Sequence, residues 1–110
     1  MKLVFFILNK EEYLEEILEA LLELGINGAT ILDSMGMGRV LAHDIPIFAG
    51  FRTLLKDTRP GNKTILILLP ESKLEALTKA VEQIIGDLDK PGTGIIFALP
   101  IEYSRGFKIY

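Results

Sequence analysis

The sequence predicts an α+β fold, and two observations indicate it. A pattern of apolar run, amphipathic helix, glycine and apolar run occupies residues 2–34 and is repeated over residues 63–99. Between the copies, residues 35–62 are rich in glycine, proline and charge and show no clean period. Short connections and right-handed crossovers then favour a ferredoxin-like βαββαβ sandwich. We expect an antiparallel sheet with a long loop between its second and third strands.

The first copy begins with a continuous apolar strand over residues 3–8. Asn9 and Glu12 have the spacing of a capping box at the start of a helix. Gly25 is placed to end that helix as a C′ glycine, and residues 29–32 form the second strand. Apolar side chains recur on the helix at the 3.6-residue period, opposite a glutamate-rich face: Leu14, Ile17, Leu18 and Leu21.

The second copy follows the same order. Residues 64–69 form an apolar strand, Ser72 and Glu75 repeat the capping-box spacing, and residues 86–94 form a polar turn. Residues 95–99 form the fourth strand, and the tail 101–110 is either a short strand or a loose end. One face of the helix is apolar: Leu74, Leu77, Val81 and Ile84.

Two helices can cover only one face of such a sheet. The first and third strands are apolar on both faces, so one alternate set of side chains would remain in water in a monomer. On the first strand that set is either Val4, Phe6 and Leu8 or Leu3, Phe5 and Ile7. A bare apolar face marks an interface, and we predict a closed cyclic homo-oligomer.

The composition limits the classes of function that the chain could have. The 110 residues form one domain, 1–110, with 49% apolar residues even without glycine, whereas a usual 45–50% includes it. There is no cysteine and one histidine, His43, which with Asp44 is thin support for a metal site. A net charge of −3 argues against nucleic-acid binding. No signal peptide or 18-residue apolar span is present, so we expect a cytoplasmic protein without direct membrane insertion.

Two glycine-containing segments are candidates for anion binding. Gly36-Met37-Gly38-Arg39 follows the second strand, where backbone N–H groups and the guanidinium could bind phosphate or carboxylate. Lys90-Pro91-Gly92-Thr93-Gly94 precedes the fourth strand and could form a small anion nest. Each could also be an ordinary turn. The apolar residues between 45 and 55 could fold over the domain, contact a neighbouring subunit or bind a partner.

Taken together, three segments resemble the nitrogen-regulatory PII signalling family, and the likeness covers nearly the whole chain. They are Ala20-Leu21-Leu22-Glu23-Leu24-Gly25-Ile26-Asn27-Gly28-Ala29-Thr30, Gly36-Met37-Gly38-Arg39 and Gly92-Thr93-Gly94-Ile95-Ile96-Phe97-Ala98-Leu99-Pro100. The resemblance implies a homotrimer of ferredoxin-like subunits with an adenine nucleotide in the cleft between them. It also implies that the long loop contacts partner proteins and that the protein regulates rather than catalyses.

The resemblance also implies roles for single residues. Thr30 would reach the adenine, and Gly36, Gly38 and Arg39 would form the loop side of the pocket. The phosphates would be wrapped from the other side by Gly92, Thr93 and Gly94.

The chain departs from the family pattern at several positions. Val40 replaces a glutamine associated with magnesium and 2-oxoglutarate, and Ile95 replaces the lysine that closes the phosphate turn, although Lys90 lies just upstream. Two expected arginines are represented loosely by Arg105 and Lys108. With fewer cations, AMP or ADP is easier to accommodate than ATP, magnesium is not expected, and the long loop lacks the tyrosine of the family's uridylylation site.

The sequence gives weaker support to two other functions. A trimeric metal-binding module resembling the CutA family is the alternative, and its metal site would need clustered histidines, cysteines or carboxylates. Enzymatic activity is disfavoured because no catalytic constellation of side chains occurs in the sequence. The expected interactions are therefore a second and third copy of the chain, an adenine nucleotide, and an unknown regulated enzyme or transporter.

Overall fold

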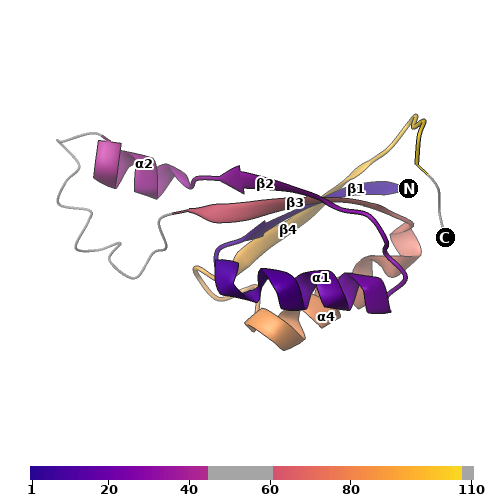
Figure 1. Ribbon diagram of the computed structural model, residues 1–110, viewed down its shortest axis with the longest axis horizontal. Coiled ribbons are helices and arrows are strands. Elements are labelled where there is room, and N and C mark those ends of the chain that lie inside the picture. The colour runs from indigo at the N-terminus through magenta and orange to yellow at the C-terminus, as the bar shows by residue number, and fades with distance from the viewer. Residues whose placement is uncertain (45–60, 108–110) are drawn as a thin grey trace.

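The computed structural model describes residues 1–44 and 61–107, with the backbone alone at residues 39 and 42–44. Its elements, shown in Figure 1, are in chain order β1 (Lys2–Leu8), the 3-10 turn η1 (Glu11–Tyr13), α1 (Leu14–Glu23), β2 (Thr30–Ser34), α2 (Met37–Asp44), β3 (Asn62–Leu69), the 3-10 turn η3 (Glu71–Lys73), α4 (Leu74–Ile85) and β4 (Gly94–Pro100).

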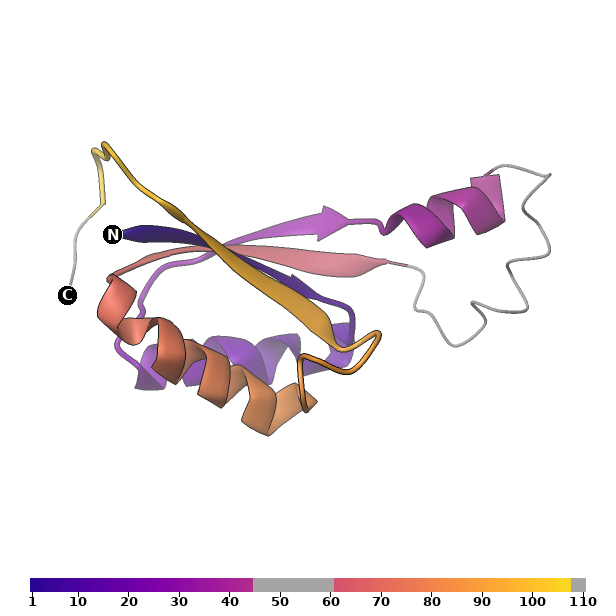
Figure 2. The ribbon, with the colours of Figure 1, turned by 180° about the vertical axis from the view of Figure 1, so that it is seen from behind.

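The strands form a four-stranded sheet in the order β2-β3-β1-β4, and every neighbouring pair is antiparallel. Helices α1 and α4 lie side by side on one face of this sheet, and within residues 1–44 and 61–107 no helix lies on the opposite face (Figures 1 and 2). The order places β1 and β3, the two strands predicted to be apolar on both faces, in the centre. The predicted ferredoxin-like α+β fold is confirmed.

The core lies between the sheet and the two helices. Alternate residues of the central strands point into it, because side chains of a strand alternate between faces. The buried set comprises Val4, Phe6, Leu8, Ile17, Leu21, Ile26, Ile65, Ile67, Leu69, Leu77, Val81 and Ile85. The choice that the sequence left open is thereby decided: Leu3, Phe5 and Ile7 face away from the helices.

The predicted glycine stop of α1 is confirmed. Gly25 has φ +80°, a conformation that L side chains rarely adopt. Around it, the N–H of Ile26 donates to the carbonyl of Leu21 at 2.8 Å, and the N–H of Gly25 donates to Leu22 at 3.0 Å. This pair of bonds is a Schellman motif, and the buried side chains of Leu21 and Ile26 complete its apolar contact.

The two predicted capping boxes are wrong. Both helices are preceded by 3-10 turns, and the residues before α1 and α4 are Tyr13 and Lys73, neither of which makes a side-chain cap. Asn9 instead uses its amide elsewhere, as described below, and Ser72 lies within η3. The bond from the N–H of Tyr13 to Lys10 at 3.0 Å shows that the backbone turn itself begins the first helix.

Each main helix has its last carbonyls capped by a lysine from the other half of the chain. The ammonium of Lys73 donates to the carbonyl of Leu24 at 2.8 Å, and that of Lys10 donates to Ile85 at 3.3 Å. A cation near a helix C-terminus also interacts favourably with the helix dipole. These two contacts connect the repeated halves through their helix ends.

The interval between the halves differs from the expectation of an irregular loop. Helix α2 occupies residues 37–44, so the segment between β2 and β3 begins with a regular element. The physical reason is local: Gly36 lies just before the helix, where its carbonyl accepts from the N–H of Val40 at 3.3 Å, and half of the helix residues are good helix formers, namely Met37, Arg39, Leu41 and Ala42. The predictions for the apolar residues 45–55, and for Lys108, fall outside the described residues.

Candidate functional site

The two glycine segments lie at the same end of the sheet. Leu8, the last residue of β1, pairs with Lys63 on one side and with Gly94 on the other. On the next strand pair, Ser34 at the end of β2 faces Asn62 at the start of β3. The segment that follows β2 and the turn that precedes β4 are therefore separated by the ends of two central strands.

At the first segment, the chain forms the start of a helix rather than an open turn. Gly36 precedes α2, and Gly38 and Arg39 belong to its first turn. The first N–H groups of a helix lack partners within it and can donate to an anion. Anion binding at this segment stays a prediction, and its donors would come from a helix terminus.

At the second segment, the turn presents backbone rather than a hydroxyl. Thr93 is only 6% exposed, and its N–H donates to the carbonyl of Lys90 at 3.4 Å. Gly92 has φ +79° and is exposed. A Cβ at Gly94 would lie 2.9 Å from the carbonyl oxygen of Ile7, so the close approach of the turn to β1 requires glycine there.

A chain of side-chain hydrogen bonds joins these two segments. Ser34 Oγ donates to Asn62 Oδ1, and Asn62 Nδ2 donates to Asn9 Oδ1 at 3.4 Å. Asn9 Nδ2 then donates to the carbonyl of Gly92 at 3.3 Å. Sequence reasoning missed Asn62 and assigned Asn9 to a helix cap. No local signal could have shown this role, because the bonded residues are 53 and 83 positions apart.

Two other predicted site residues lie away from this end of the sheet. Thr30 begins β2 and pairs with Leu66, which pairs with Phe5, so Thr30 lies level with the middle of the sheet. Arg105 follows β4, whose last residue pairs with Lys2 at the opposite end. By strand rise, β4 spans about 20 Å from Gly94 to Pro100, so the length of this strand separates Arg105 from the Gly92 turn.

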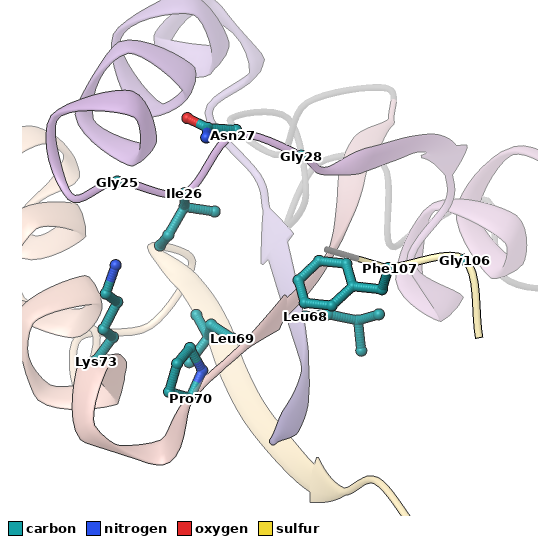
Figure 3. A pocket seen from close by; sticks show the side chains of 10 residues that line it. All are labelled: Gly25, Ile26, Asn27, Gly28, Leu68, Leu69, Pro70, Lys73, Gly106 and Phe107. Carbon is teal, nitrogen blue, oxygen red and sulfur yellow. The ribbon is translucent and has the colours of Figure 1, made fainter. Parts of the chain in front are cut away.

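A pocket of about 430 Å³ lies at that opposite end, between the end of α1 and the C-terminal tail (Figure 3). Phe107 lies beside Leu68 in this view, and Lys73 projects from the other side of the pocket. The ammonium of Lys73 already donates to the carbonyl of Leu24. Apart from the polar Asn27, the lining is otherwise glycine backbone and apolar side chains: Gly25, Ile26, Gly28, Leu68, Leu69, Pro70, Gly106 and Phe107.

An ion pair lies close to the first glycine segment, on the face of the sheet that α1 and α4 cover. Lys63 donates to the carboxylate of Asp33, its partner in the β2–β3 register. The hydrogen bond that Lys63 donates to Asp33 is the main cause that raises the pKa of Lys63, and the charges of Asp33 and Glu11 add to it. The ammonium at this end of the sheet is therefore already paired with a carboxylate.

The helix-free face of the sheet is apolar across three strands. Phe5 stacks on Phe97 with ring centroids 4.9 Å apart and an interplanar angle of 7°. On β4, Ile95, Phe97 and Leu99 are 55%, 44% and 48% exposed. Leu3, Leu66 and Leu68 extend the same surface over β1 and β3, by register. We call this surface the bare face.

Within residues 1–44 and 61–107, no three or more His, Cys, Asp or Glu side chains are grouped so that they could hold a metal ion. In the same part of the chain, no helix has the length and apolar character needed to cross a membrane.

Comparison with known proteins agrees with the fold and the segments described above. The family model described as "Nitrogen regulatory protein P-II" matches residues 1–106. A protein from Azospirillum brasilense named "Nitrogen regulatory protein P-II" is 33% identical over 89 residues, which covers 81% of this chain and 76% of that protein.

Proposed function

The chain belongs to the nitrogen regulatory P-II family, and from this premise we propose that it is a trimeric signalling protein that binds an adenine nucleotide between subunits. In this proposal the nucleotide state is communicated to a partner enzyme or transporter through the segment between β2 and β3. Proteins of the family are regulators rather than enzymes, which agrees with the signalling role.

One observation carries the proposal: the candidate residues are spread along the length of the sheet. Gly36, Gly38 and the 92–94 turn lie at one end, Thr30 lies level with the middle, and Arg105 lies at the other end. Because the length of β4 separates Arg105 from the glycine segments, a site that uses both needs a second copy of the chain. A cleft between subunits meets this requirement.

The bare face supports assembly. It is formed by side chains from β1, β3 and β4 that no helix covers, and exposed apolar area of this extent favours association. A closed ring of copies buries the same face in every subunit and leaves none exposed. Three copies are proposed because the family resemblance implies a trimer.

Within the cleft, the proposed donors are largely backbone. The first turn of α2 and the turn at Gly92 would donate N–H groups to the phosphates, since both expose backbone at the same end of the sheet. The guanidinium of Arg39 would add a charge-assisted bond, and Lys90, which is exposed, would add a second cation. Thr30, Arg105 and Lys108 would come from the neighbouring subunit.

Isothermal titration with AMP, ADP, ATP and cyclic nucleotides tests the proposal. We expect saturable binding with one site per subunit, and a rise in melting temperature with the same ligands, because a ligand that binds only the native state stabilises it. Sedimentation at micromolar concentration should give a trimer. Absence of binding by every adenine nucleotide, with stabilisation by Cu²⁺ or Zn²⁺ alone, would instead favour the CutA-like metal module.

A further inference from the structure

Asn9 has a position in the sheet that lets it contact both neighbours of the central strand. It directly follows Leu8, which pairs with Lys63 of β3 and with Gly94 of β4. Asn62 directly precedes Lys63, and Gly92 lies two residues before Gly94. A polar side chain at position 9 therefore stands between the start of β3 and the turn before β4.

The amide of Asn9 uses both of its ends in this position. Its Oδ1 accepts from Asn62 Nδ2 at 3.4 Å, and its Nδ2 donates to the carbonyl of Gly92 at 3.3 Å. Asn62 in turn accepts from the hydroxyl of Ser34, the last residue of β2. An amide that donates at one end and accepts at the other has its orientation set by both partners.

We propose that Asn9 is a positioning residue that holds the Gly92 turn in register with the base of the segment between β2 and β3, acting through Asn62. Ser34 is followed within two residues by Gly36, so a shift at the base of α2 reaches Asn62 and then Asn9. Reorientation of the Asn9 amide would withdraw the hydrogen bond from Gly92. The link lies within one subunit and does not need a ligand to exist.

The consequence for signalling rests on the proposed function. If both glycine segments contact one nucleotide, a ligand that fixes the Gly92 turn also favours one arrangement at the base of α2. The coupling is reciprocal, since two sites that bias one arrangement each change the affinity of the other. Asn9 would then carry part of the response of the α2 segment to nucleotide.

Hydrogen exchange of the ligand-free protein tests the positioning directly. The readout is the exchange rate of the Thr93 amide, which is bonded within the turn, divided by that of the Phe6 amide in the core strand. This ratio corrects for any loosening of the whole subunit. Asn9→Asp keeps the acceptor for Asn62 but cannot donate to Gly92, and we expect it to raise the ratio at least threefold.

Asn62→Asp is the decisive variant, because no bond joins Asn62 to the turn. The new carboxylate keeps the acceptor for Ser34 but can no longer donate to Asn9, and it draws the amide of Asn9 toward itself as a donor. We expect Asn62→Asp to raise the Thr93 ratio at least threefold. In a protein that already carries Asn9→Ala, adding Asn62→Asp should leave the Thr93 ratio unchanged. The control Asn27→Asp makes the same change at an exposed asparagine at the opposite end of β2 and should leave the ratio unchanged.

Two results would overturn the positioning role. One is a Thr93 ratio that does not respond to Asn9→Asp or to Asn62→Asp. The other is an equal response to Asn62→Asp with and without Asn9. Titration with AMP, ADP, ATP and cyclic nucleotides distinguishes this from the proposed function: if the unmodified protein binds none of them, the proposed function fails while the exchange result still decides the role of Asn9.

Discussion

Phe5 and Phe6 are adjacent in the chain, yet they should fail in different ways when they are changed. Phe6 is fully buried between the sheet and the helices, whereas Phe5 lies on the bare face and stacks on Phe97. Truncating a buried phenylalanine loses its transfer free energy and leaves a cavity, at a cost of about 3–5 kcal/mol. For Phe6→Ala we expect a loss of that size in the free energy of unfolding of the subunit.

For Phe5→Ala the isolated subunit should lose much less. The stack with Phe97 contributes about 0.5–1.5 kcal/mol beyond area burial, and the ring is only half-buried in the subunit. The larger effect of this position should be on assembly, because the bare face is proposed to lie between subunits. Phe5→Lys should abolish the trimer, since it would place an unpaired charge in an apolar interface.

Sedimentation velocity and urea unfolding at two protein concentrations separate the two effects. Phe6→Ala should lower the unfolding midpoint at both concentrations. Phe5→Lys should give a folded monomer whose unfolding midpoint no longer depends on concentration. A trimer that survives Phe5→Lys, or a folded-subunit loss for Phe5→Ala as large as that for Phe6→Ala, would refute the assignment of the two faces.

Three further changes test the site and the frame that holds it. Arg39→Ala should weaken nucleotide binding by about 1.5–3 kcal/mol in isothermal titration, which is the range for a charge-assisted hydrogen bond, and should leave the melting temperature of the ligand-free protein unchanged. If the variant and the unmodified protein bind every adenine nucleotide with the same affinity, the role of Arg39 is contradicted. Gly94→Ala should lower the free energy of unfolding by about 1–3 kcal/mol, because its Cβ would meet the Ile7 carbonyl at 2.9 Å, whereas Gly28→Ala, with no atom within 4 Å, should not. Lys73→Met should lower the free energy of unfolding in urea by about 0.5–2 kcal/mol, because it removes the ammonium that caps the carbonyl of Leu24. The control Lys79→Met breaks an exposed ion pair with Glu75 and should lower it by less than about 0.5 kcal/mol. Equal losses would show that the cap stabilises the protein no more than an exposed ion pair does.

The local patterns of the chain were enough for the fold class. The 3.6-residue period of the helices, the apolar central strands and the position of Gly25 each depend on neighbours in sequence, and they agree with one topology. Right-handed crossovers and short connections leave few ways to arrange two βαβ units. The family likeness likewise rests on short segments in a given order, which sequence contains directly.

Helix starts were less predictable. A capping box requires the side chain of one residue to bond with backbone groups close to it in sequence. The side chain of Asn9 instead bonds with Asn62 and Gly92, which are distant in sequence. The helix at 37–44 shows the reverse case, in which local helix formers outweighed the glycines that suggested an irregular loop. Neither the missing capping box nor the helix at 37–44 changes the topology. Both change which backbone N–H and carbonyl groups remain available for hydrogen bonds.

The sequence by itself determined that β1 and β3 are apolar on both faces and that two helices can cover only one of them. It could not determine which face, because alternation makes Leu3, Phe5 and Ile7 equivalent to Val4, Phe6 and Leu8 until the helices are placed. Only the tertiary structure decided that, because the way each strand is oriented against the helices sets which alternate side chains point toward them. It also decided that the 92–94 turn and the base of α2 meet through Asn9 and Asn62, because such a bond depends on strand register rather than on any local pattern.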